Sequence, residues 1–166
     1  ILTYSLTSAS SLELEPVSLE EVVSRAADQL RTEFTQRDVQ LDIVKPLTSA
    51  RGHASLLIQV VVNLFTNAAK FVAQGATPRI KVWTERRLAE KSMVRLWIED
   101  NGIGVALDDQ EHIFGLFERG HVMDQYSGTG IGLAIVRRGI ERMGGRVGLE
   151  STLGVGSRFW VELPEG

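Results

Sequence analysis

The chain has 166 residues, of which 43% are hydrophobic and 23% are charged, and its net charge is −3. This length allows one compact domain with a real core and is too short for two ordinary ones. The mild acidity argues against a nucleic-acid-binding face, which needs clustered basic residues, and the absence of cysteine excludes disulfides, cysteine-based zinc sites and a thiol nucleophile.

The hydrophobic residues are distributed in short runs. No apolar run approaches the roughly 18 residues of a membrane span, so we expect this stretch of chain to make no membrane contact and to lie in the cytoplasm, even if its parent protein is anchored in a membrane. The chain begins with Ile1 rather than methionine, and we expect it to be a fragment of a longer protein.

The first half of the chain predicts two helices and three strands. Residues 1–15 show no core-sized pattern. Ser18 and Glu21 have the spacing of a helix-capping box, and apolar residues recur at helical spacing over 18–36. The further predicted elements are a strand over Val39–Val44, a helix over 54–73, and strands over Arg79–Thr84 and Met93–Glu99.

The second half is richer in glycine. Residues 100–132 predict loops, with a short helical stretch near 108–114. A helix is predicted over 130–143, and two alternating strands, Arg146–Glu150 and Ser157–Leu163, close the chain. Because helices and strands are segregated along the chain, the sequence predicts a layer of helices on a mixed sheet.

One polar stripe runs along the otherwise apolar helix 54–73. On a helical wheel, Asn67 lies about 40° and Lys70 about 20° from Asn63, on opposite sides of it. A helix this apolar is buried on most sides, so its polar stripe must find partners. Asparagines that bond neighbouring backbone are one explanation. A lysine in line with two amides also suits an anionic ligand together with a hard cation such as Mg²⁺.

A carboxylate followed by glycines stands at the end of the strand 93–99, in Asp100-Asn101-Gly102-Ile103-Gly104. Such a carboxylate can accept from an exocyclic amine while the glycine backbone approaches the ligand closely. That acceptor favours adenine, which presents an amino group where guanine presents a carbonyl. An ordinary Asp-Asn-Gly turn has the same pattern.

A second glycine loop, residues 127–133, opens directly into the helix 130–143. Free N–H groups at a helix N-terminus can bind phosphate. The loop lacks the Gly-Lys-Ser/Thr of a P-loop and the spacing of a dinucleotide fingerprint. Upstream of it, Phe114 and Phe117 precede a glycine-rich stretch, which predicts the anchor of a lid. A small satellite core explains the two phenylalanines equally well.

These motifs, in this order, resemble those of the catalytic ATP-binding domain of sensor histidine kinases, which belongs to the GHKL ATPase superfamily. The N box is matched by Asn63–Phe71, the first two glycine boxes by Asp100–Gly104 and Gly128–Leu133, the F box by Phe114–Arg119, and the last glycine box by Gly154–Phe159.

The resemblance covers residues 16–164 and implies a fold. That fold is the α+β two-layer sandwich of the superfamily, the Bergerat fold, with a mixed, mostly antiparallel sheet covered on one face by about three helices. Residues 1–15 resemble the remnant of a dimerisation helix hairpin and linker.

The resemblance also implies an ATP site with a Mg²⁺ ion. Asn67 would be the main metal ligand with Asn63 assisting, Lys70 would contact phosphate, Asp100 would read the adenine amino group, and Arg119 would reach the γ-phosphate. The remaining residues implied to contact the nucleotide are Phe71, Gly102, Gly104, Phe117, Gly128, Thr129, Gly130, Ile131, Gly132, Leu133, Ser157 and Phe159.

Such a domain donates the γ-phosphate of ATP to a histidine on a separate dimerisation domain, the first step of a two-component phosphorelay. In hydrolysing members of the superfamily a glutamate one turn before the metal-binding asparagine activates water. This chain has Asn63 there, and an amide is no general base. Transfer to histidine needs positioning and electrostatic help more than strong activation. An anti-sigma-type serine kinase and a hydrolysing ATPase remain alternatives.

The implied partners are the phosphoacceptor helix hairpin, in the same chain or its partner in a homodimer, and the receiver domain of a response regulator. His53, His112 and His121 lack the expected context of the acceptor and are predicted to lie at the surface. The chain is therefore expected to bind Mg-ATP without phosphorylating itself. A binding module with a dead pocket is disfavoured because the key polar residues of the site are present.

Overall fold

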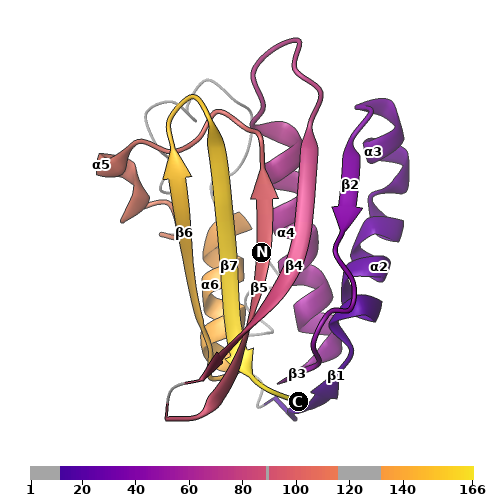
Figure 1. Cartoon of the computed structure of the whole chain (residues 1–166), viewed down its shortest axis with the longest axis vertical. Helices are drawn as coiled ribbons and strands as arrows, with labels where there is room; N and C mark the ends of the chain where they lie inside the picture. Colours follow the sequence, from indigo (N-terminus) through magenta and orange to yellow (C-terminus); the bar gives the residue numbers. More distant parts are fainter. Residues whose placement is uncertain (1–11, 89, 116–131) are drawn as a thin grey trace.

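The computed structural model describes residues 12–88, 90–115 and 132–166. A five-stranded mixed sheet forms one layer, with the strands in the order β2-β4-β5-β7-β6 (Figure 1). β2 pairs parallel to β4, and the other neighbours pair antiparallel. The strands are β2 (Gln40–Ile43), β4 (Arg79–Leu88), β5 (Ser92–Asp100), β6 (Arg146–Thr152) and β7 (Gly156–Pro164).

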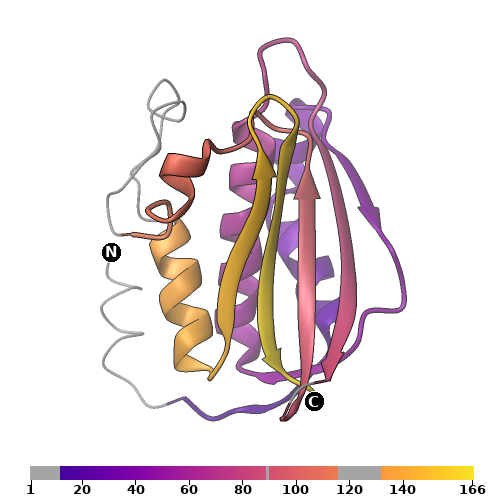
Figure 2. The same ribbon diagram turned by 60° about the vertical axis from the view of Figure 1, so that its left-hand side comes forward.

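The helices form the second layer, on one face of the sheet (Figure 2). A separate two-stranded sheet pairs β1 (Glu15–Val17) antiparallel to β3 (Ala50–Gly52). The predicted α+β two-layer fold is thereby confirmed. The helices are α2 (Leu19–Gln29), α3 (Arg31–Gln36), α4 (Ala54–Lys70), α5 (Leu107–Gln110) and α6 (Gly132–Arg142).

Helix α4 is the centre of the helical layer. It packs between α2 and α6 and against strands β4 and β5, which explains why its sequence is apolar on most sides. Phe65 and Leu57 are fully buried, and Phe65 packs against Phe34 of α3 with ring centroids 5.9 Å apart. The polar stripe predicted on this helix is half-buried, so its side chains lie at the edge of the core.

The predicted helix over 18–36 is in fact two helices. At Leu30 the backbone leaves helical geometry, with φ −103° and ψ 10°. The change of direction brings Phe34 into the core. The capping box is partly confirmed, since the Ser18 hydroxyl accepts from the backbone N–H of Glu21.

Helix α4 ends at Lys70, three residues before the predicted end. The carbonyl of Phe71 accepts a hydrogen bond from the N–H of Ile103 (2.8 Å), so the chain is fastened to the glycine loop instead of continuing the helix. Strands β1 and β3 were not predicted. Each has three residues, too few for a periodic pattern, and their pairing depends on tertiary contact.

The sheet face opposite the helices carries all three tryptophans. Trp83, Trp97 and Trp160 are cross-strand neighbours in one row, and the rings of Trp83 and Trp97 stack at 5.8 Å with an interplanar angle of 7°. The guanidinium of Arg95 lies 3.7 Å from the Trp160 ring centroid. Trp97 is consequently 7% exposed, although none of the described helices covers this face.

A buried ion pair lies beside the tryptophan row. The Glu162 carboxylate is 3% exposed and accepts from Arg95 Nε at 3.0 Å and from Arg146 Nη2 at 2.8 Å. Burial by itself raises the pKa of Glu162, but the hydrogen bonds from Arg146 and Arg95 outweigh it and hold the pKa below its ordinary value. Around the tryptophan row, the open face is therefore packed by its own side chains.

Replacing Glu162 tests how much this ion pair stabilises the fold. The Arg95 side chain is 11% exposed, so Glu162→Ala leaves a buried charge unpaired and should cost about 3–5 kcal/mol of unfolding free energy. The matched control Glu21→Ala removes an exposed ion pair with Arg25 and should cost less than about 1 kcal/mol. Urea denaturation measures both. Equal losses in the two variants would contradict this account of the open face.

Candidate functional site

A small cavity lies where the C-terminal end of α4 meets the end of β5 and the start of β7. Its volume is about 20 Å³, enough for about one water molecule. All of its lining residues were predicted site residues except Ile103 and Val105, whose apolar side chains in a glycine loop gave no signal of a site. The lining residues are Asn67, Phe71, Asp100, Ile103, Gly104, Val105, Leu133, Ser157 and Phe159.

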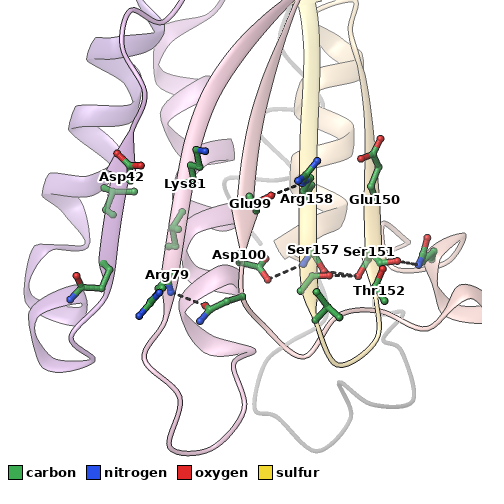
Figure 3. A pocket seen from close by; sticks show the side chains of 17 residues that line it. Asp42, Arg79, Lys81, Glu99, Asp100, Glu150, Ser151, Thr152, Ser157 and Arg158 are labelled. Carbon is green, nitrogen blue, oxygen red and sulfur yellow. Dashed lines mark hydrogen bonds and ion pairs between the residues drawn. The ribbon is translucent and has the colours of Figure 1, made fainter.

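Asp100 is the charged residue of this cavity. It is the last residue of β5, and its Oδ1 accepts from the backbone N–H groups of Gly102 (2.8 Å) and Ser157 (3.2 Å; Figure 3). Burial raises the pKa of Asp100 to about 6, although these two hydrogen bonds oppose the shift, and the charge of Glu99 adds to it. The site therefore holds a carboxylate that is costly to ionise.

The loop after Asp100 approaches its neighbours too closely for side chains. A Cβ on Gly102 would lie 2.5 Å from the carbonyl oxygen of Phe71. Gly104 has φ +75°, and a Cβ there would lie 2.2 Å from the carbonyl oxygen of Thr152. Glycine is required at both positions. The first glycine loop thus lies in close contact with both the end of α4 and β6, next to the Asp100 carboxylate.

Asn101 holds the neighbouring turn in place. Its Oδ1 accepts from the N–H of Arg79 (2.8 Å), and its Nδ2 donates to the carbonyl of Thr77 (2.9 Å). These bonds fasten the start of β4 to the end of β5. The sequence motif contains this residue, but its structural role follows from contacts with a segment more than 20 residues away in the chain.

The polar stripe of α4 is only partly in the cavity. Asn67 lines it, whereas Asn63 and Lys70 do not. The Asn63 Nδ2 donates to the carbonyl of Gln59 at 2.9 Å, which turns its Oδ1 toward the first residue of α6: a Cβ built on Gly132 would lie 3.2 Å from that oxygen. The Lys70 ammonium lies 5.8 Å from the centroid of the Phe71 ring.

Two amide oxygens are therefore the candidate ligands for a hard cation. Within the described ranges no group of three or more His, Cys, Asp or Glu side chains is arranged to hold a metal. Asn63 and Asn67 stand one helical turn apart, and amide oxygens are acceptable ligands of Mg²⁺. The donor set fits one or two protein ligands with the remaining positions left to phosphate and water.

Several predicted site residues lie outside the described residues, and their roles stay predictions. They are Phe117, Arg119, Gly128, Thr129, Gly130 and Ile131. His121 lies there as well.

The histidines agree only in part with the prediction. His112 is exposed as expected. His53 is half-buried, and its Nδ1 accepts from the N–H of Leu56 at 3.3 Å. It caps the N-terminus of α4, so its interpretation as a surface residue was wrong. A capping histidine uses one ring nitrogen for the helix.

A wider groove, with a volume of about 1040 Å³, lies on the open face of the sheet (Figure 3). Asp100 and Ser157 belong to the linings of both the groove and the cavity. The groove is the larger, but its charged side chains alternate across the strands, and Arg158 forms an ion pair with Glu99. We assign the candidate site to the small cavity because the Asp100 carboxylate and Asn67 of α4 meet there.

No described helix is both long enough and sufficiently apolar to cross a membrane. This finding concerns the residues outside the gaps at 1–11, 89 and 116–131.

Known proteins resemble this chain in sequence and in fold. Residues 52–166 match the family model described as histidine kinase-, DNA gyrase B- and HSP90-like ATPase. The phytochrome-like protein Cph1 of Synechocystis sp. is 36% identical over 166 residues, which are 100% of this chain and 22% of that protein. The sensor histidine kinase AruS of Pseudomonas aeruginosa is 40% identical over 147 residues, 87% of this chain and 14% of AruS.

A solved structure also resembles this chain in fold. Full-length ShkA in complex with AMPPNP superposes with a TM-score of 0.80 at 30% identity, over 99% of this chain and 34% of that one. The chain spans about a fifth or less of the length of the curated relatives named above. The resemblance inferred from the five motifs is confirmed.

Neutralising Asp100 should stabilise the fold at neutral pH. The carboxyl group has a higher pKa in the folded state than in the unfolded state, so its stabilising effect is complete below pH 3.8 and is lost as the pH rises through about 6. The loss amounts to about 3 kcal/mol. Asp100→Asn keeps an oxygen acceptor for Gly102 and Ser157 without the charge.

We expect Asp100→Asn to be more stable than the wild type at pH 7.5 by about 1–3 kcal/mol, and the difference to shrink toward zero near pH 4. Thermal unfolding followed by circular dichroism at both pH values measures this. A pH-independent difference between the two proteins would contradict the buried-charge explanation.

Proposed function

The chain belongs to the family of histidine kinase-, DNA gyrase B- and HSP90-like ATPases, and we propose that it is the domain of a sensor histidine kinase that binds Mg-ATP and donates the γ-phosphoryl group. The acceptor is a histidine on a separate dimerisation domain, and a response-regulator receiver domain then takes the phosphoryl group. This role is supported by the sensor kinases among the relatives and by the polar groups around Asp100.

The half-buried carboxylate of Asp100 is the observation that carries the proposal. Its Oδ1 is occupied by two backbone N–H groups, which leaves Oδ2 as an acceptor in the cavity. An exocyclic amino group satisfies a buried acceptor, whereas a carbonyl placed there leaves two acceptors facing each other. Phe71 and Phe159 line the same cavity and offer apolar surface to a base. Together these groups suit the amino edge of adenine, and the cavity, whose volume is about 20 Å³, has to widen to admit the ring.

The phosphate end of the nucleotide is assigned to α4 and the start of α6. Asn67 would bind Mg²⁺ with Asn63 assisting, and Lys70 is assigned to phosphate. Bound Mg²⁺ supplies charge neutralisation at the β- and γ-phosphates. Asn63 Oδ1 faces Gly132, so the amide stripe and the helix N-terminus border one region, and both favour an anionic ligand with its cation.

The absence of a base separates this proposal from hydrolysis. Asn63 stands where hydrolysing relatives have their glutamate, and its amide is already donating to Gln59. The side chain is therefore oriented as an oxygen ligand and has no capacity to take a proton from water. Phosphoryl transfer to a positioned imidazole requires no such proton abstraction.

Nucleotide titrations test the adenine-reading role. Isothermal calorimetry should show that Mg-ATP binds about 10–100-fold more tightly than Mg-GTP, because a guanine carbonyl leaves Asp100 unsatisfied. In Asp100→Asn the side-chain amide donates where the carboxylate accepted. The affinity for ATP should therefore fall by a similar factor, while the affinity for GTP should change little. Glu21→Ala, on the far helix α2, serves as the control. Equal wild-type affinities for ATP and GTP would refute the assignment.

Labelling with γ-³²P-ATP tests the phosphoryl donor role. The chain alone should acquire no label, because its described histidines are a helix cap and an exposed residue of the loop region. Adding the dimerisation hairpin of the parent protein as a separate polypeptide should place acid-labile label on that hairpin. Acid-stable label on another protein would instead support a serine kinase, and steady release of phosphate by the chain alone would support a hydrolysing ATPase.

A further inference from the structure

Ser151, on β6, lines the wider groove and not the small cavity, and so does Gln110. The Ser151 Oγ is 2.7 Å from the N–H of Val105, 3.0 Å from the carbonyl of Gly156 and 2.8 Å from the Ser157 Oγ. A hydroxyl has one hydrogen and two lone pairs. All three contacts are hydrogen bonds only if Ser151 donates to Gly156 and accepts from both Val105 and Ser157.

This assignment determines the hydrogen bonding of the Ser157 hydroxyl. Since its hydroxyl hydrogen is given to Ser151, the Ser157 oxygen has lone pairs left for the cavity that it lines. The backbone N–H of the same residue donates to Asp100 Oδ1. Asp100 and Ser157 are register partners on β5 and β7, so two acceptors stand side by side at one edge of the cavity.

Gln110, the last residue of α5, completes the arrangement. Its Nε2 donates to the carbonyls of Val105 (2.9 Å) and Ser151 (3.2 Å), which uses both hydrogens of the amide. Val105 is therefore held at its N–H by Ser151 and at its carbonyl by Gln110. The same loop touches β6 at Gly104, where no Cβ fits against the carbonyl of Thr152.

We propose that Ser151 and Gln110 are positioning residues that set the nucleobase preference of the site. They act through Ser157 and Val105, keep the Ser157 oxygen an acceptor, and hold it beside Asp100 so that both accept from one exocyclic amino group. This inference rests on the proposed ATP-binding function. It also couples α5, which precedes the segment predicted as a lid in the chain, to the recognition of adenine.

The test compares ATP with purine riboside triphosphate, which lacks the 6-amino group, by calorimetry on the whole chain with Mg²⁺. The wild type should prefer ATP by about tenfold or more. Ser151→Ala removes the acceptor for Ser157 and should reduce that preference to about twofold to threefold, mainly by weakening ATP binding. Ser151→Thr keeps the hydroxyl and should restore it.

Gln110→Glu provides a second, isosteric variant in case Ser151→Ala fails to fold. It replaces the donor by a carboxylate facing two carbonyls, so it should also lower the preference for ATP over the amine-free analogue by about threefold or more. Leu107→Ala, a residue of α5 that is 82% exposed, is the matched control and should leave the preference unchanged.

The outcomes distinguish the positioning role of Ser151 and Gln110 from the proposed ATP-binding function. A wild type that binds neither triphosphate would refute the proposed function itself. A wild type that prefers ATP, with variants that lose affinity for both triphosphates by the same factor, would show that Ser151 and Gln110 are merely structural and would overturn the positioning role alone. Failure of Ser151→Thr to restore the preference would also contradict it.

Discussion

The structure is organised around a half-buried carboxylate, that of Asp100, at the end of its central strand. Asp100 is held by backbone N–H groups from two directions, Gly102 in its own loop and Ser157 on the next strand. Burying an ionisable group without an ion-pair partner is unfavourable, and the raised pKa of Asp100 reflects that cost. The glycine loop, the hairpin β6–β7 and the end of α4 meet at this position. The carboxylate whose pKa is raised by burial therefore lies at the candidate site.

The two faces of the sheet are packed by different kinds of side chain. The helical face buries apolar side chains of α4 and its neighbours. The other face lacks a described covering layer. There the Arg95 guanidinium packs on the tryptophan row, and Glu162 forms ion pairs with Arg95 and Arg146. The sheet that carries Asp100 is thus packed on both faces, and a packed sheet transmits strain rather than absorbing it. A stiff support suits the site that we propose, in which selectivity depends on the placement of two acceptors.

Much of the fold and of the site was predictable from local patterns. The apolar period of residues 54–73 identified α4, and the same wheel placed Asn63 and Asn67 on one stripe. The motif around Asp100 identified the loop. Contacts between distant segments escaped prediction: the break at Leu30, the early end of α4 where Phe71 meets Ile103, and the three-residue strands β1 and β3. None of these leaves a periodic trace in the sequence.

The sequence by itself identified the groups that we propose for nucleotide binding: the asparagines of α4, the aspartate of the first glycine loop and the glycines of residues 127–133. It did so because those groups follow one another at fixed spacings on single elements. Tertiary structure alone decided that Asn67 lines the cavity while Asn63 faces Gly132, and that Ser151 bonds Ser157 while Gln110 bonds Val105. Those relations join strands and helices distant in sequence, and hydrogen-bond geometry exists only once the elements have packed.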